Sequence, residues 1–320
     1  MLGLAITSQA ARQRAWWPAG ARFAADFINR RAMSNGVQLP LSAVLTLSRA
    51  SVKRAKTSTG HWATFAANEP AITDLGMLIE PEATNLIINN TADSGAGIQL
   101  TGTTMTALPF GQSPGLDGFA KRVTQGGGAS DSVVRSGLSV SGGTTYTWSQ
   151  SVRYEAGAPW MRFVFSDNVA HGLHIWLNLA TMTIGTTGTF GAAVLSGYSL
   201  TAEADGWYRV AMTGSVPNNA VGGLSGYVCG DSGLTTRQSG QFHIWMPQME
   251  TGPSATSPVQ TAGLAEARQT DAATAHFGTT VSSPTLHNLE GAPMVFGGSW
   301  TSLAIPSVSP KTARLLAAMA

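Results

Sequence analysis

The sequence predicts a mainly β protein, built as a sandwich or barrel, and three observations predict it. Its 320 residues include 37 glycines and only 11% charged residues, a composition that suits short strands and tight turns. From about Leu41 onward, short runs rich in Val, Ile, Thr and aromatic residues alternate with Gly, Asn, Asp and Pro. The single cysteine, Cys229, rules out an internal disulfide, so packing must hold the fold together.

The first 40 residues predict a short helical segment ahead of the β region. They read as two short helices interrupted near Pro18, the second with Phe23, Phe27 and Ile28 on one stripe and its end near Gly36. An apolar stripe on an isolated helix needs a partner surface that buries it. We therefore interpret residues 1–40 as an anchor.

Charge is distributed unevenly along the chain. Residues 1–56 carry nine basic side chains and one acidic one, a net +8, whereas the remaining residues carry ten basic and sixteen acidic ones, a net −6. The basic arm is either a solvated helical face or a surface that docks onto an acidic protein; no nucleic-acid recognition module accompanies it. The expected docking residues are Arg12, Arg14, Trp16, Trp17, Phe23, Phe27, Arg30 and Arg31.

Strand signals are clearest in the middle of the chain and sparse after about Ala275. The ranges that read best as strands are 144–154, 160–166, 173–180, 206–214 and 241–249. The end of the chain reads as a short helix with Ser309 as its cap and Pro310 at its first position. No run approaches the roughly 18 apolar residues of a membrane span, and the N-terminus lacks a signal-peptide core. We expect the chain to be synthesised in the cytoplasm and not to insert into a membrane.

Five separated segments carry a resemblance to a known family. They are GMLIEPEATNLIINN (76–90), TTYTWSQSVRY (144–154), HIWLNLATMTIGT (174–186), ADGWYRVAMTGS (204–215) and FHIWMPQMETGPSATSPVQT (242–261). In order and spacing they resemble a domain common in phage tail and head-spike fibre proteins, over roughly residues 41–275. The resemblance implies an antiparallel jelly-roll β-sandwich, of the kind seen in carbohydrate-binding modules, carried on a virion for attachment to the host surface.

The expected organisation is therefore a helical anchor (1–40), a jelly-roll domain (41–275) and a C-terminal appendage (276–320). The resemblance implies a non-enzymatic spike or fibre component of a phage, or of a phage-derived gene-transfer particle, located at the particle surface. Its expected partners are host cell-surface polysaccharide and other virion proteins, and by analogy it is a homo-oligomer. Two alternatives stay open: a structural connector of the virion, and a capsule depolymerase.

Alternation along three strands predicts a candidate glycan face. Sugar rings favour flat aromatic surfaces flanked by a few polar groups. Residues that alternate with core positions supply such a set: Trp160, Arg162, His174, Trp176, His243 and Trp245. The alternative is that this face is covered by a loop, by the C-terminal tail or by another subunit. Trp207, which follows a turn, is interpreted as a plug at the end of the core.

The motifs that would indicate an enzyme or a metal site lack the structural context or the further residues that such a site needs. GQSPG (111–115) has the spacing of a nucleophile elbow, but Pro114 and the glycines after it continue a loop. His171 and His174 lack further metal ligands. The acidic pairs Glu80/Glu82 and Glu203/Asp205 lie beside a proline and at a turn, so a depolymerase is disfavoured. We expect no catalytic residues, no metal and no cofactor.

Overall fold

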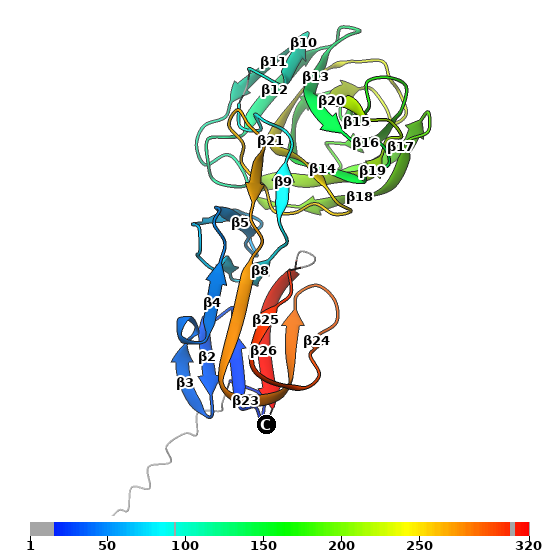
Figure 1. The fold of residues 1–320 in the computed structure, drawn as a ribbon. Helices are drawn as coiled ribbons and strands as arrows, with labels where there is room; N and C mark the ends of the chain where they lie inside the picture. The colour runs from blue at the N-terminus through cyan, green and yellow to red at the C-terminus, as the bar shows by residue number, and fades with distance from the viewer. Residues whose placement is uncertain (1–15, 93, 308–310, 320) are drawn as a thin grey trace, which may run out of the picture.

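The computed structural model describes residues 16–92, 94–307 and 311–319. Figure 1 shows a β-sandwich stacked on a second β unit, with the long orange strand β23 running down the second unit. Two single-turn 3-10 helices, η1 (Leu41–Ala43) and η2 (Ala204–Gly206), interrupt the strands. No helix in the described ranges is long and apolar enough to cross a membrane.

Two six-stranded antiparallel sheets form the sandwich. In spatial order, the first contains β10 (Ile98–Thr101), β13 (Ser132–Val140), β20 (Ala220–Cys229), β15 (Trp160–Ser166), β16 (Gly172–Asn178) and β17 (Thr183–Phe190). The second contains β11 (Thr103–Ala107), β12 (Lys121–Gly126), β21 (Ser239–Thr251), β14 (Tyr146–Gly157), β19 (Tyr208–Ser215) and β18 (Val194–Ala202). The pairs β12/β21, β13/β20 and β14/β19 alternate between the sheets, as in a jelly roll. The predicted antiparallel jelly-roll sandwich is confirmed.

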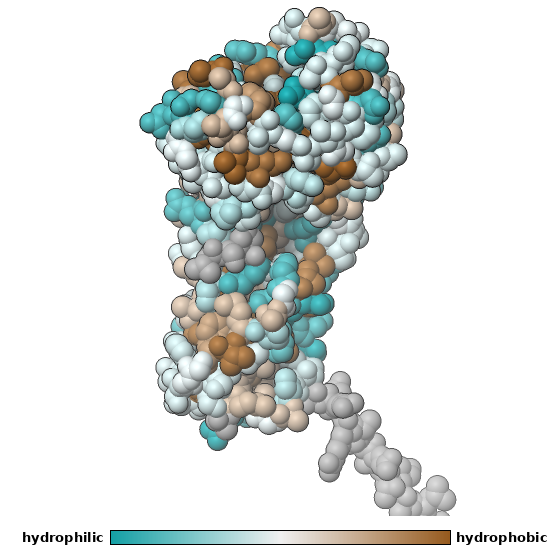
Figure 2. All heavy atoms as spheres, turned by 90° about the vertical axis from the view of Figure 1, so that its right-hand side faces the viewer, coloured by the Kyte–Doolittle hydropathy of each residue, from teal (hydrophilic) through white to brown (hydrophobic). Residues whose placement is uncertain are grey.

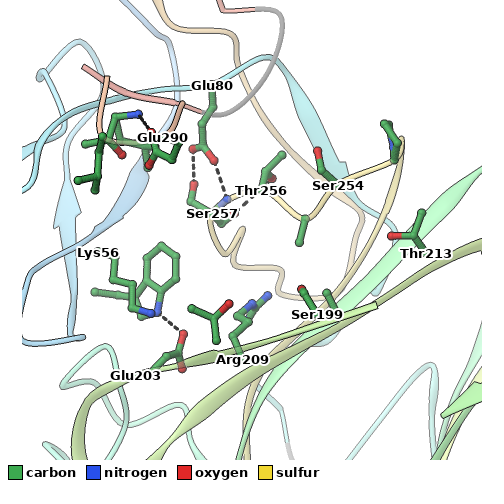
Figure 3. Close-up of a pocket in the computed structure, with 18 of the residues that line it drawn as sticks. Lys56, Glu80, Ser199, Glu203, Arg209, Thr213, Ser254, Thr256, Ser257 and Glu290 are labelled. Carbon is green, nitrogen blue, oxygen red and sulfur yellow. Dashed lines mark hydrogen bonds between the residues drawn. The ribbon is translucent and has the colours of Figure 1, made fainter. Parts of the chain in front are cut away.

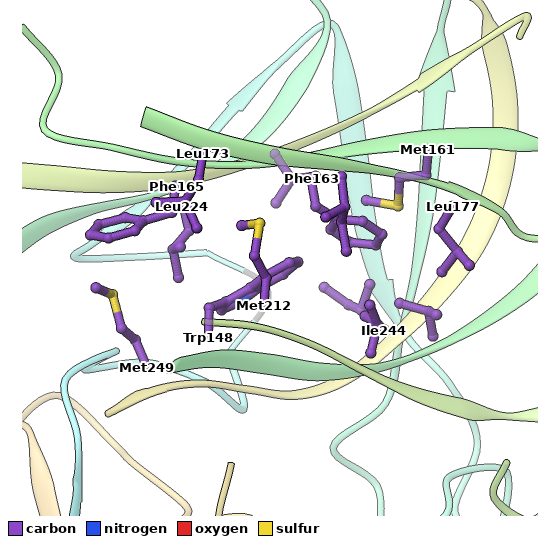
Figure 4. Close-up of a cluster of buried hydrophobic side chains, with 14 of the residues drawn as sticks. Trp148, Met161, Phe163, Phe165, Leu173, Leu177, Met212, Leu224, Ile244 and Met249 are labelled. Carbon is purple, nitrogen blue, oxygen red and sulfur yellow. The ribbon is translucent and has the colours of Figure 1, made fainter. Parts of the chain in front are cut away.

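The core of the sandwich lies between the two sheets. Inward residues of the first sheet, such as Phe163 and Leu173, meet Trp148 and Met212 of the second (Figure 4). The rings of Trp148 and Phe163 lie 4.7 Å apart between centroids. Each of these residues alternates with an outward one along its strand, which is why period-two patterning located the strands.

The second unit combines both ends of the chain in one ten-stranded sheet. Its main path is β24 (Met294–Val295), β23 (Ala272–Asn288), β26 (Lys311–Met319), β1 (Phe23–Asp26), β2 (Arg31–Ser34) and β3 (Val37–Pro40). Also joined to it are β4 (Leu45–Ser48), β25 (Ser299–Ile305), β7 (Ile72–Thr73) and β8 (Gly76–Ile79). Two short two-stranded sheets complete the fold: β5 (Lys53–Lys56) with β6 (Trp62–Phe65), and β9 (Ala83–Asn85) with β22 (Glu266–Arg268).

The predicted second N-terminal helix is wrong, because its residues form the antiparallel strands β1, β2 and β3. Asn35 and Gly36 both have positive φ, 49° and 80°, and make the two-residue turn between β2 and β3. Asn-Gly is a hairpin signal as well as a helix stop. Phe23 and Phe27 are fully buried in the second unit, where Phe23 packs against Phe277 with centroids 4.8 Å apart. They are therefore core residues of this chain.

The other predicted docking residues have different positions. Trp16 and Trp17 are partly exposed, and their rings meet edge to face. Arg31 lies over the Trp16 ring and pairs with Asp26 at 3.1 Å, whereas Arg30 is exposed. Residues 12 and 14, both predicted docking arginines, lie outside the described residues, as does the predicted first helix up to residue 15.

The predicted C-terminal helix is also wrong over its described residues. Residues 311–319 form β26, which pairs with β23 on one side and with β1 and β8, at successive segments, on the other. Pairing on both sides overrides the helical preference of Leu and Ala in this segment. Ser309 and Pro310 lie outside the described residues. Strands from all three predicted ranges, 1–40, 41–275 and 276–320, share the ten-stranded sheet.

Candidate ligand-binding cleft

The six residues of the predicted glycan face do not form one surface. Trp160, Arg162, His174 and Trp176 come from β15 and β16 and lie together on the outer side of the first sheet. His243 and Trp245 come from β21, which pairs with β12 and β14 in the second sheet. Alternation shows which side of a strand a residue occupies, but not the sheet to which the strand belongs.

The first-sheet cluster is largely covered by its own chain. Trp176 is only 3% exposed, and its indole N–H donates to the carbonyl of Leu234 at 2.9 Å. The Arg162 guanidinium lies 4.8 Å from the Trp176 ring centroid and donates to the Tyr227 hydroxyl at 2.8 Å. The stacked cation and rings stabilise one another. This cluster is mainly a small outer core, with little free aromatic surface.

Acid should destabilise this cluster through His174. Desolvation and the neighbouring Arg162 lower the pKa of His174 to about 4, from an ordinary value of 6.5. Between these values the unfolded chain binds a proton that the folded chain does not, so stability is full above pH 6.5 and falls as the pH drops toward 4. We expect His174→Gln to flatten this part of the pH dependence, measured by urea unfolding at pH 4–7. Equal slopes in parent and variant would contradict the assignment.

On the second sheet, the loop of residues 108–120 covers Trp245. The Trp245 side chain is fully buried and donates to Asp117 Oδ1 at 2.9 Å. Trp207 is also fully buried, so it is a packing residue as interpreted, but it belongs to this small cluster and not to the core between the two sheets. His243 is held between Arg153, at 3.0 Å, and Glu155, at 2.7 Å. The alternative of a face covered by a loop is therefore the correct one here.

The principal cavity among the described residues lies where the sandwich meets the second unit. Its volume is about 730 Å³, within the usual range for ligand sites. The outer side of β18 and β19 forms one wall, and the β5–β6 hairpin, β8 and the loop of residues 253–257 form the others (Figure 3). The molecular surface narrows at this junction (Figure 2). We call this cavity the interunit cleft.

Two aromatic side chains line the interunit cleft from different elements. Tyr198 stands on the edge strand β18 with 51% of its surface exposed. Trp62 begins β6 and is half-buried, and its indole N–H donates to Glu203 Oε1 at 2.7 Å. That bond fixes the Trp62 ring while leaving the other oxygen of Glu203 without a hydrogen-bond partner among the described residues. The cleft thus offers two aromatic side chains, one of them held in place by a largely buried carboxylate.

Charged groups of both signs surround these rings. Arg209 is buried near the start of β19. Its guanidinium donates hydrogen bonds to Ser149 Oγ at 2.8 Å and to the carbonyl of Met246 at 3.1 Å. Desolvation lowers the pKa of Arg209 to about 10, so it remains protonated at neutral pH. Lys56 also lines the cleft; burial lowers its pKa, and the charge of Glu203 opposes that shift.

Hydroxyl groups complete the lining. They come from Ser199 and Thr201 on β18, Thr213 on β19, and Ser254 and Thr256 in the loop of residues 253–257. The rest of the lining includes leucine, alanine and proline side chains, further serines and threonines, and the acids Glu80 and Glu290. An apolar cleft with aromatic rings and a few donors and acceptors suits a ligand that is itself both apolar and hydroxylated.

Sequence reasoning missed the interunit cleft, although it examined Glu203 as a turn acid. Trp62 and Glu203 are 141 positions apart in the chain, and only the packing of the β5–β6 hairpin on β18 and β19 brings them together. Tyr198 alternates with other residues of an edge strand and carries no distinguishing motif. The one available signal was a tryptophan, Trp62, upstream of the first of the five recognised segments.

The motifs considered for catalysis have structural explanations. Ser113 of the GQSPG motif is buried in a turn, where its hydroxyl donates to Asp117 Oδ1 at 2.8 Å, and no helix follows it. The interpretation of a loop is confirmed. His171 Nδ1 accepts the backbone N–H of Ala192 at 2.8 Å. Within the described ranges, no group of three or more potential metal ligands occurs.

Comparison with known proteins gives a partial likeness of fold. No family model and no curated protein matches the chain. One similar solved structure holds the CBM22-1 and GH10 modules of an endo-1,4-β-D-xylanase from Clostridium thermocellum with xylohexaose; identity is 17%, the TM-score is 0.30, and the match covers 54% of this chain and 28% of that one. Another is the CBM22-2 xylan-binding domain of a Paenibacillus barcinonensis protein, with 11% identity, a TM-score of 0.32, and coverage of 52% and 98%. At these values the likeness carries no argument about the ligand.

Proposed function

We propose that this protein is a non-enzymatic surface component of a phage, or of a phage-derived gene-transfer particle, that binds host-surface glycan in the interunit cleft. The observation that carries the ligand class is that Tyr198 and Trp62, the latter held by Glu203, line one cavity of about 730 Å³ together with several hydroxyl groups. Aromatic faces stack on the C–H faces of sugar rings, and the hydroxyls of the lining exchange hydrogen bonds with those of the sugar.

The biological setting rests on the five sequence segments that resemble phage fibre and spike proteins. In this setting the second unit faces the particle, since it carries the N-terminal end of the described chain (Figure 1). Partly exposed Trp16 and Trp17 and exposed Arg30 lie in that unit and suit an acidic docking surface. By analogy with such fibres, we expect a homo-oligomer on the particle surface.

Trp62→Ala and Tyr198→Ala should each weaken glycan binding by about tenfold, or ~1.4 kcal/mol, because each removes a stacking surface. The measurement is binding of the full chain to host cells and to their extracted polysaccharide, with circular dichroism to show that each variant is folded. Phe190→Ala is the matched control, since Phe190 is an exposed ring outside the cleft. Equal loss in all three variants, or no binding by the folded parent, would overturn the site.

The depolymerase alternative is tested on the same material. We expect no reducing ends to be released from the polysaccharide during incubation. Release of reducing ends that is lost in the Glu203→Gln variant would instead indicate a hydrolase, since Glu203 is one of the acids that line the cleft. A folded parent that neither binds nor cleaves would favour the structural connector.

A further inference from the structure

Two polar side chains face the interior of the sandwich from opposite sheets. Arg135 lies two positions after the inward Val133 on β13, and Gln150 lies between the inward Trp148 and Val152 on β14. Because every second residue of a strand shares a face, both side chains point inward. Arg135 is 5% exposed and Gln150 is 7% exposed. Core positions of a sandwich are normally apolar, so a guanidinium and an amide here need a physical reason.

The charge of Arg135 has no counter-ion among the described residues. Its Nη1 donates to the carbonyl of Asn89 at 3.0 Å, while its Nη2 is buried and has no hydrogen-bond partner. No carboxylate lies within ion-pair distance of it in the described part of the chain. Desolvation lowers the pKa of Arg135 to about 10, which leaves it protonated at neutral pH. An unpaired buried cation is strongly unfavourable.

A small cavity adjoins this unpaired cation. Its volume is about 20 Å³, and both Arg135 and Gln150 line it, together with Ser225. The rest of its wall is mostly apolar and includes five residues labelled in Figure 4: Trp148, Met161, Phe163, Leu224 and Ile244. A space of this size holds one water molecule or one small ion.

We propose that this cavity binds a chloride ion between the Arg135 guanidinium and the Gln150 amide. Both groups supply N–H donors, and the guanidinium supplies the compensating positive charge. A water molecule would fill the space and accept a hydrogen bond from Nη2, but it would leave the buried charge uncompensated. The apolar remainder of the wall favours a monatomic anion over phosphate or sulfate, which need many donors.

Crystals of the unmodified protein grown in sodium bromide would test the site directly. Bromide replaces chloride and scatters anomalously, so we expect an anomalous peak in the cavity beside Arg135. The control is a crystal grown in sodium acetate, which should show no such peak. Bromide at the surface alone, with a water molecule or nothing in the cavity, would overturn the proposal.

Halide-dependent stability provides a second test in solution. At constant ionic strength, replacing acetate by chloride should raise the folding equilibrium constant by about tenfold for each tenfold rise in chloride above its Kd. Arg135→Met should lose this chloride-specific increase. If Arg135→Met does not fold, Gln150→Leu replaces it in the test and should show a smaller chloride-specific increase than the parent. Arg237→Met is the control for general anion effects, because Arg237 lies outside the cavity. The same chloride dependence in parent and variants would overturn the site. Neither test depends on glycan binding.

Discussion

Replacing Asp271 with alanine should lower the free energy of unfolding by about 3–5 kcal/mol, because it leaves the buried Arg49 without a carboxylate partner and leaves the buried Lys53 with Glu80 alone. Asp271 Oδ1 accepts from Arg49 at 2.9 Å, and its Oδ2 pairs with Lys53 and accepts the backbone N–H of Glu80 at 2.9 Å. All three side chains of this ion pair network are fully shielded from solvent. Desolvation lowers the pKa of Lys53, and the negative charges of Glu80 and Asp271 oppose this lowering.

Urea unfolding of the parent and of Asp271→Ala measures this loss. Asp26→Ala is the matched control, because Asp26 pairs with Arg31 at a partly exposed position and should cost only about 0–1 kcal/mol. A double variant, Asp271→Leu with Lys53→Met, should recover part of the loss, since it also removes one of the stranded charges. Similar losses for Asp271→Ala and Asp26→Ala would show that the buried network contributes little.

This network also bears on the interunit cleft. Glu80 lines the cleft and belongs to the network, pairing with Arg268 at 3.0 Å and accepting from the Ser257 backbone N–H at 2.8 Å (Figure 3). Ser257 ends the loop that forms one wall. The network therefore joins the β5–β6 hairpin, β8 and the cleft loop, so it fixes the spacing between the walls that would hold a ligand.

The sandwich strands were predictable because their environment is regular. Residues 160–166 were predicted as a strand and form β15, and the range 241–249 lies within β21, Ser239–Thr251. Each strand has one face on the core, so its apolar residues recur with period two. The resemblance supplied the jelly-roll arrangement, which periodicity alone does not give.

The second unit was not predictable in the same way. Its strands near both chain ends are short or rich in alanine and leucine, as in β1, FAAD, and β26, KTARLLAAM. Such sequences favour helices when considered locally, and only pairing between segments nearly 300 residues apart makes them strands. The interunit cleft was unpredictable for the same reason. Its two aromatic residues, Trp62 and Tyr198, lie far apart in the sequence, and only the packing of the folded chain brings them to one cavity.

Trp245→Ala should destabilise the protein by about 3–5 kcal/mol, the usual cost of truncating a fully buried tryptophan. Trp245 is 0% exposed and packs with Trp207, and its indole N–H donates to Asp117 Oδ1. The sequence alone made Trp245 a candidate ligand residue, with a covered face as the alternative, and the structure makes it a buried residue. Trp62→Ala should cost less stability, because Trp62 is only half-buried, but it should weaken glycan binding.

Thermal or urea unfolding and glycan binding, measured on both variants, separate the two roles. For Trp245→Ala we expect a large loss of stability, with near-parental affinity in the fraction that remains folded. For Trp62→Ala we expect the reverse, a modest loss of stability and about tenfold weaker binding. Trp245→Phe serves as the more conservative control, because it keeps an aromatic ring at this position, and it should lose less stability than Trp245→Ala. A folded Trp245→Ala variant that has lost binding while Trp62→Ala retains it would place the ligand on the second sheet, as alternation along β21 first indicated.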